Sequence, residues 1–172
     1  MGKNNGNIVL IGMPGAGKST LGVVLAKIMN KQFIDADLVI QQRAGKTLQA
    51  IIDEEGPEGF ISVEGEVLSG IEANNSVIAT GGSAIYSDGA MTHLANIGTI
   101  VYLEISCESL LERLGDLEER GVVLKDGVGM NLRDLYNERR PLYEKYADQT
   151  VSVDGMSISA AARKVAATCR EG

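Results

Sequence analysis

A short glycine-rich stretch near the amino terminus constrains the fold of this chain more than any other feature. It reads GMPGAGKST, covers residues 12–20 and directly follows the apolar run of residues 8–11. Its first eight residues fit the pattern G-x-x-x-x-G-K-[ST], in which backbone N–H groups surround phosphate oxygens and the following helix adds its positive end. With this chain's composition, a chance match has a probability of roughly 1%. We therefore expect a strand, a phosphate-binding loop and a helix in this order.

The same stretch assigns roles to its own residues. Lys18 is expected to reach the β- and γ-phosphates of a nucleotide, and Ser19 to complete the coordination shell of Mg²⁺. The predicted nucleotide-binding residues of the loop are Gly12, Gly15, Ala16, Gly17, Lys18, Ser19 and Thr20. ATP and Mg²⁺ are the predicted cofactors.

The rest of the chain alternates short apolar strands with helices. Strands are expected over residues 7–11, 32–35, 77–80, 99–105 and 151–153. Helices are expected over residues 18–30, 37–43, 47–54, 59–74, 87–95, 107–114, 130–146 and 157 to about 170. Breaks are expected at Gly45 and at Gly56-Pro57, and Pro141 should kink or split its helix. This alternation predicts a parallel sheet covered on both faces, with ligands beyond the carboxyl ends of the strands.

Composition narrows the class of protein. The length of 172 residues suits one domain, residues 1–172, and the net charge of −7 argues against a nucleic-acid partner. The amino terminus lacks a signal-peptide pattern, and no apolar run is long enough for a membrane span. We expect a cytoplasmic monomer whose two cysteines, Cys107 and Cys169, are buried free thiols. The single histidine, His93, is expected to be structural.

A pair of carboxylates follows the second predicted strand, in the segment FIDAD of residues 33–37. If the chain is extended there, Asp35 and Asp37 point the same way, toward the nucleotide. One could reach Mg²⁺, and the other could accept a hydrogen bond from the hydroxyl of a phosphate acceptor. The alternative is a turn in which Asp37 merely caps the next helix. The residues alone leave both readings open.

Three further features face the same predicted crevice. Thr80-Gly81-Gly82-Ser83 follows a strand, so its backbone suits either the close approach of a ligand or a tight turn. Arg120 and Arg139 could clamp a phosphate or a carboxylate, although most arginines are solvated surface residues.

Together these segments resemble the shikimate kinase family over nearly the whole chain. The motifs that carry the resemblance, in the family's order and spacing, are GMPGAGKST, FIDAD, ATGGS, LEERGVVL and YNERRPLYEKYA. The resemblance implies a three-layer α/β/α phosphate-loop kinase fold with a five-stranded parallel sheet. It also implies an acceptor-binding region at about residues 35–63 and a mobile lid at about residues 115–129.

The resemblance also implies individual roles. Ser19 and Asp35 would serve Mg²⁺, and Asp37 would bind the acceptor hydroxyl and take its proton. The remaining implied contacts are Gly81 and the backbone N–H of Gly82 on the substrate, Arg120 on the phosphates, Arg139 on the substrate carboxylate and Arg113 on adenine.

Two positions depart from the family's pattern. In FISVE, residues 60–64, Ile61 stands where the family has an arginine that is a second ligand of the substrate carboxylate. Ser83 stands where the family has a third glycine. Losing one charge-assisted hydrogen bond costs about 1.5–3 kcal/mol. Arg140 is a candidate to compensate for the missing arginine.

The expected activity is the Mg·ATP-dependent phosphorylation of a hydroxyl on a small metabolite. Shikimate, converted to shikimate 3-phosphate, is the leading acceptor. One alternative is another polyol or hydroxy acid, including one without a carboxylate. A second alternative is a protein that binds nucleotide as a sensor and transfers no phosphate.

Overall fold

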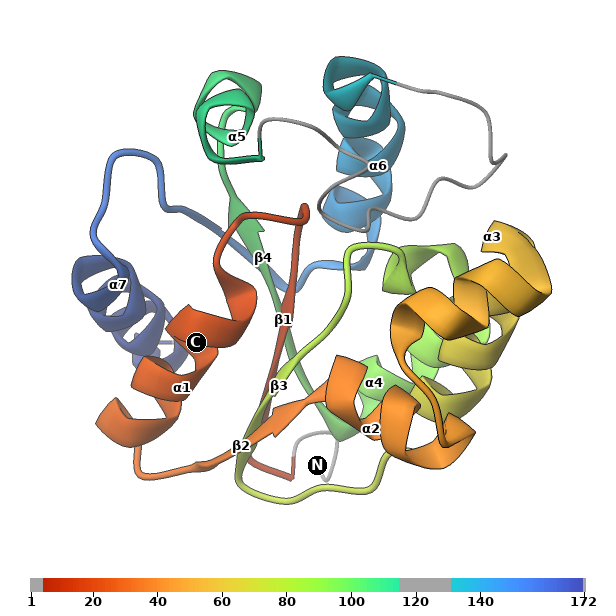
Figure 1. Ribbon diagram of the computed structural model, residues 1–172. Helices are drawn as coiled ribbons and strands as arrows, with labels where there is room; N and C mark the ends of the chain where they lie inside the picture. Colours follow the sequence, from red (N-terminus) through yellow and green to blue (C-terminus); the bar gives the residue numbers. More distant parts are fainter. Residues whose placement is uncertain (1–4, 115–130, 172) are drawn as a thin grey trace.

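The architecture is a five-stranded, wholly parallel sheet, seen in a computed structural model that describes residues 5–114 and 131–171. The spatial order of the strands is β2-β3-β1-β4-β5 (Figure 1). Their bounds are β1 Asn7–Ile11, β2 Gln32–Asp35, β3 Ser76–Ala79, β4 Gly98–Glu104 and β5 Gln149–Ser152. The central strand β1 is buried along its whole length, because helices cover both faces of the sheet. This confirms the predicted fold class.

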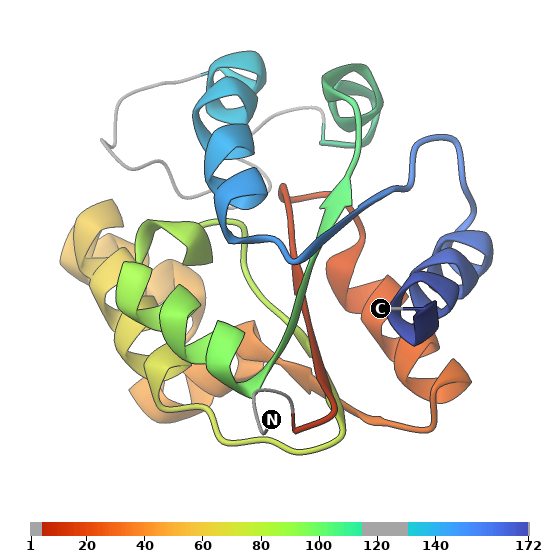
Figure 2. The same cartoon turned by 180° about the vertical axis from the view of Figure 1, so that it is seen from behind.

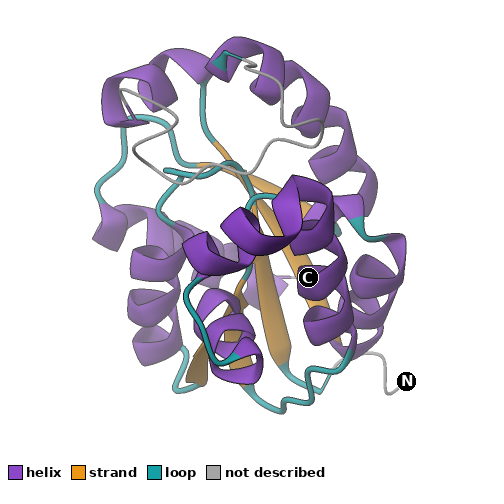
Figure 3. Cartoon of the chain, turned by 45° about the vertical axis from the view of Figure 1, so that its right-hand side comes forward, coloured by secondary structure: helices purple, strands orange, loops and turns teal. Residues whose placement is uncertain are grey.

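The helices form two outer layers. Helices α1 (Lys18–Ile28) and α7 (Ile158–Glu171) cover one face of the sheet. The other face carries α2 (Ala36–Ala44), α3 (Leu48–Ser69) and α4 (Asp88–Ile97), as Figures 1 and 2 show from opposite sides. Figure 3 shows the strands enclosed between these layers. The short helix η1 (Ala84–Tyr86) follows β3.

Two helices lie beyond the carboxyl ends of the strands. These are α5 (Cys107–Leu114) and α6 (Leu132–Tyr146), at the top of Figure 1. Helix α6 buries Leu135, Arg139 and Tyr143, which are spaced four residues apart and therefore lie on one face. Of the two outcomes that we expected at Pro141, a kink or a split, the split does not occur, since the missing N–H removes one hydrogen bond and the helix continues to Tyr146.

Helix α2 begins one residue before its predicted start. Asp35 has extended backbone angles, and its Oδ1 accepts a hydrogen bond of 2.9 Å from the backbone N–H of Asp37. Asp35 is therefore the residue that caps α2. The reading in which Asp37 is the cap is wrong. Asp37 instead stands in the first helical turn, so the two carboxylates do not share one face of an extended strand.

The predicted break at Gly56-Pro57 lies inside α3. Gly56 has φ 74° and ψ 173°, a conformation open only to glycine, so two helical pieces meet there at a kink. The second piece ends at Ser69, five residues before its predicted end. It carries Phe60 and Glu64 on the side that faces the sheet's carboxyl end.

The core has two parts. The larger part surrounds the sheet, and a smaller one lies between α2 and α3, made of Ile40, Ile51, Phe60 and Val67. Of the two thiols, Cys107 is buried and Cys169 half-buried. His93 Nε2 is 2.7 Å from the carbonyl oxygen of Ile71, which agrees with a structural role. No helix in the described ranges is long and apolar enough to cross a membrane.

Candidate active site

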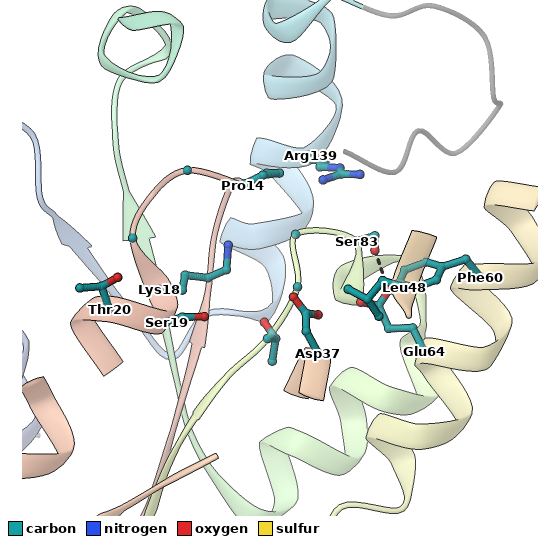
Figure 4. A pocket seen from close by; sticks show the side chains of 15 residues that line it. Pro14, Lys18, Ser19, Thr20, Asp37, Leu48, Phe60, Glu64, Ser83 and Arg139 are labelled. Carbon is teal, nitrogen blue, oxygen red and sulfur yellow. Dashed lines mark hydrogen bonds between the residues drawn. The ribbon is translucent and has the colours of Figure 1, made fainter. Parts of the chain in front are cut away.

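A cavity lies beyond the carboxyl ends of β1 and β3, where four helices and two loops meet (Figure 4). It brings together most of the residues that the sequence predicts for nucleotide, metal and acceptor. The residues that line it are Pro14, Gly15, Gly17, Lys18, Ser19, Thr20, Asp37, Leu48, Phe60, Glu64, Thr80, Gly81, Gly82, Ser83 and Arg139.

The loop between β1 and α1 has the backbone that a phosphate-binding loop needs. Gly12, Gly15 and Gly17 all have positive φ angles, of 149°, 86° and 87°. A Cβ on Gly12 would lie 2.9 Å from the carbonyl oxygen of Leu103 on β4, so this position has no room for a side chain. Gly17 caps α1, whose amino-terminal N–H groups therefore face the cavity. The loop thus provides backbone donors and a helix dipole to an anion.

Lys18 is almost fully buried at the floor of this loop. Its ammonium donates hydrogen bonds to the carbonyl oxygens of Gly12, at 2.7 Å, and Met13, at 2.9 Å. Burial lowers the pKa of Lys18 to about 8, while the carboxylates of Asp37 and Glu64 oppose this shift. The ammonium remains mostly protonated at neutral pH and is held where phosphate oxygens can replace the loop carbonyls.

Ser19 and Asp35 lie together, as their predicted metal role requires. Ser19 Oγ donates to Asp35 Oδ2 at 3.3 Å, while Asp35 Oδ1 caps α2. A hydroxyl and a carboxylate are the oxygen ligands that Mg²⁺ uses beside nucleotide phosphates and water. In the described ranges, no group of three or more His, Cys, Asp or Glu side chains is placed to hold a metal. The pair therefore fits a magnesium ion that is shared with a nucleotide.

Asp37 projects into the cavity from the first turn of α2. Burial raises the pKa of its carboxyl, the nearby Asp35 raises it further, and Lys18 opposes the shift. A carboxylate with a raised pKa is a stronger base toward a hydroxyl proton. Asp37 therefore has the position and basicity to accept a proton from a hydroxyl bound in the cavity.

Gly81 and Gly82 bring bare backbone to the same place. A Cβ on Gly82 would lie 2.8 Å from Arg139 Nη1 and 2.8 Å from Pro14 Cδ. Tyr143 OH donates to the carbonyl oxygen of Gly82 at 2.7 Å, which joins α6 to this loop. A side chain at position 82 would therefore displace Arg139 or Pro14 from the cavity wall.

Arg139 presents a buried guanidinium to the cavity from α6. Only 1% of its surface is exposed, its Nε donates to Tyr86 OH at 3.3 Å, and its guanidinium carbon lies 5.3 Å from the centre of the Tyr86 ring. A buried guanidinium with a fork of donors suits a bidentate carboxylate or phosphate ligand.

The other predicted arginines differ in place. Arg113, on α5, donates from Nη1 to the carbonyl oxygen of Gly15 at 3.2 Å, beside the phosphate loop. Arg140 lies outside the cavity, because its side chain meets Glu104 and Glu144 at 3.8 and 2.9 Å. It therefore does not compensate for a missing arginine in this arrangement. Arg120 and the predicted lid at residues 115–129 lie outside the described residues.

Sequence reasoning missed the wall formed by α3. Leu48 and Phe60 are its apolar part, and Glu64, one helical turn after Phe60, is its buried carboxylate. The spacing of Phe60 and Glu64 by four residues was the available signal, since such residues share a helix face. Ile61 is not part of this wall. It lies half-buried against the smaller core and lines an adjoining hollow with Tyr86 and Ser87.

Comparisons with known proteins show to which family this chain belongs. The sequence model of the family described as "Shikimate kinase" matches residues 14–170. The chain belongs to the shikimate kinase family. A shikimate kinase of Francisella tularensis subsp. holarctica is 42% identical over 161 residues, which cover 92% of each chain.

Solved structures agree with this membership. A shikimate kinase from Acinetobacter baumannii, in complex with shikimate, is 31% identical with a TM-score of 0.83, covering 96% of this chain and 93% of its own. The shikimate kinase from Aquifex aeolicus is 32% identical with a TM-score of 0.79, covering 95% and 96%. The protein is thus a small-molecule kinase that uses ATP and Mg²⁺. The phosphate loop and the Ser19–Asp35 pair fit these two cofactors.

Proposed function

We propose that this kinase transfers the γ-phosphoryl group of ATP to a hydroxyl of shikimate. The observation that carries the proposal is the presence of Asp37 and the buried guanidinium of Arg139 in one cavity. Shikimate is a cyclic carboxylate with several hydroxyls, so it offers a partner to each group. The relative from A. baumannii, solved in complex with shikimate, supports the same acceptor.

The residues divide the work between donor and acceptor. Lys18 and the loop N–H groups neutralise the β- and γ-phosphates, and Ser19 with Asp35 holds Mg²⁺, which neutralises developing charge when it is bound. Arg113 lies where it can contact the nucleotide, and Arg120 is proposed to act on the phosphates. The protein forms no covalent bond to the phosphoryl group in this account. Its contribution is alignment, charge neutralisation and the exclusion of water.

On the acceptor side, Asp37 orients the attacking hydroxyl and accepts its proton as the new P–O bond forms and the bond from the γ-phosphorus to the bridging oxygen breaks, so that ADP leaves. Arg139 holds the carboxylate at the far side of the ring, and the backbone at Gly81 and Gly82 contacts the acceptor. Since Lys18 and Asp37 line the same cavity, the hydroxyl and the γ-phosphate meet between them.

One observation favours a second candidate, a kinase for another polyol or hydroxy acid. Arg139 is the one arginine among the described residues that lines the cavity, and the apolar Ile61 lies outside it. A single guanidinium discriminates less strongly for a carboxylate than a pair would.

A panel of acceptors separates these possibilities. ADP release would be measured with Mg·ATP and shikimate, gluconate or neutral polyols at matched concentrations. The proposal predicts the highest kcat/KM for shikimate. A higher value for another acceptor would support the second candidate. ATP binding without ADP formation in the presence of any acceptor would indicate a nucleotide-binding protein that transfers no phosphate.

A further inference from the structure

Glu64 is a buried carboxylate in the acceptor half of the cavity whose two oxygens have different environments. It is 1% exposed, on the face of α3 that lines the cavity. Its Oε1 accepts a hydrogen bond of 2.6 Å from Ser83 Oγ, drawn as a dashed line in Figure 4. Its Oε2 has no hydrogen-bond partner among the described residues. A buried acceptor of this kind carries a large desolvation cost until a donor reaches it.

The unpaired oxygen lies close to the group that activates the acceptor. A Cβ on Gly81 would be 2.9 Å from Glu64 Oε2 and 3.1 Å from Asp37 Oδ1. Two carboxylate oxygens, one from α3 and one from α2, therefore converge over the bare backbone of Gly81. A small molecule that lies on this glycine meets both of them at once.

The chemistry of the two oxygens selects the kind of group that binds between them. Carboxylates accept hydrogen bonds, and neighbouring hydroxyls of a polyol donate them with a spacing that such a pair can span. A carboxylate of the bound molecule would be repelled at this point by the negative charges of Glu64 and Asp37. Lys18 and Arg139 act on Glu64 through their charge, but neither supplies the missing hydrogen bond.

We propose that Glu64 Oε2 accepts a hydrogen bond from a second, non-reacting hydroxyl of the acceptor, next to the hydroxyl that Asp37 holds. Glu64 is then a specificity-determining residue that selects acceptors with adjacent hydroxyls. Ser83 is a positioning residue, because its hydrogen bond to Oε1 fixes the carboxylate and leaves Oε2 directed at the acceptor. This inference rests on the proposed function, which places the reacting hydroxyl at Asp37.

The test compares Glu64→Gln with the wild-type kinase. The amide keeps the shape and still accepts from Ser83, but it presents an NH₂ donor where Oε2 accepted. We expect the KM for shikimate to rise by about 10–100-fold, while kcat changes little and the KM for ATP is unchanged. Ser83→Ala should raise the same KM by a smaller factor. The matched control is Glu66→Gln, which makes the same change at an exposed position of α3 outside this cavity and should have no effect.

Acceptor analogues give a readout that a merely structural role would not change. Each of the two non-reacting hydroxyls of shikimate is removed in turn. For one of these monodeoxy analogues, kcat/KM in the wild type should fall to the level of Glu64→Gln, and the substitution should then have no further effect. If Glu64→Gln lowers kcat/KM by the same factor for shikimate and for both analogues, the inference is overturned.

The outcomes for the inference and for the proposed function are separate. If the wild type phosphorylates shikimate and Glu64→Gln has the same KM, the inference fails and the proposed function stands. If the wild type phosphorylates no acceptor in the panel, the proposed function itself fails. If Glu64→Gln does not fold, Ser83→Ala with the two analogues decides in the same way.

Discussion

At the scale of single residues, the cavity holds two ionisable side chains, Lys18 and Glu64, whose charged forms are disfavoured by burial. Burial lowers the pKa of Lys18 from its ordinary value of 10.5 to about 8 and raises that of Glu64 from 4.5 to about 7. Each shift means that the folded state disfavours the charged form of the group. Groups kept despite such a cost are typical of functional sites.

We expect Lys18→Met to abolish phosphoryl transfer without destabilising the protein. The substitution removes the charge that acts on the β- and γ-phosphates, and it also removes an ammonium whose burial costs free energy below pH 8. Turnover with Mg·ATP and shikimate should fall below detection, while the Tm in thermal unfolding should stay equal or rise. Lys27→Met, at an exposed position of the same helix, is the matched control and should keep full turnover. Substantial turnover in folded Lys18→Met would contradict the assigned role.

Glu64 should make the stability of the protein pH-dependent. The groups that act on it are Ser83, Asp37 of α2, Arg139 of α6 and Lys18 of α1. Because the pKa of Glu64 is higher in the folded state, that state binds more protons between pH 4.5 and about 7. The Glu64 contribution therefore lowers the free energy of unfolding as pH rises through this window, by up to about 3 kcal/mol.

Glu64→Gln removes this titration. The Tm of the variant relative to the wild type should therefore increase from pH 5 to pH 8, measured by thermal unfolding at each pH. The difference for Glu66→Gln, at an exposed position, should stay nearly constant. A difference for Glu64→Gln that is equal at pH 5 and pH 8 would show that the carboxyl is not held at a raised pKa.

At the scale of elements, the segment after β3 determines how closely the helices approach the acceptor. We expect Gly81→Ala to lower kcat/KM for shikimate by roughly 10–100-fold, since the added methyl displaces both Asp37 and Glu64 from their positions. Gly89→Ala is the matched control in the first turn of α4, where the nearest atom is Ser69 Oγ at 4.0 Å. Its activity should be unchanged and its stability within about 1 kcal/mol of the wild type. Normal kcat/KM in Gly81→Ala would argue against an acceptor seated on this backbone.

Elements were predictable where a local rule decides them. The phosphate loop, the strand before it and the break at Gly56-Pro57 follow from glycine, proline and apolar runs in short windows. The start of α2 was misplaced because both Asp35 and Asp37 are good capping residues, and only the backbone angles of Asp35 decide between them. Whether α6 continues through Pro141 depends on the packing of its buried face against the rest of the protein, which a local rule does not include.

At the scale of the whole molecule, the donor half of the site could be predicted from the sequence more fully than the acceptor half. The donor half is contiguous, so its motif was sufficient to place Lys18 and Ser19. The acceptor half is assembled from α2, α3, α6 and the segment after β3. The hydrogen bond between Glu64 on α3 and Ser83 in the segment after β3 spans 19 positions of the chain, and no short pattern encodes it. The parallel sheet makes such assembly possible, because its strands all deliver their carboxyl ends to one edge.

The most direct test of the account is the identity and amount of product. The purified protein would be incubated with ATP, Mg²⁺ and shikimate, with ADP and phosphorylated shikimate quantified together by mass spectrometry. We predict equal amounts of the two products with the wild-type protein, and neither product with Lys18→Met. Formation of ADP without phosphorylated shikimate, at saturating shikimate, would contradict the account.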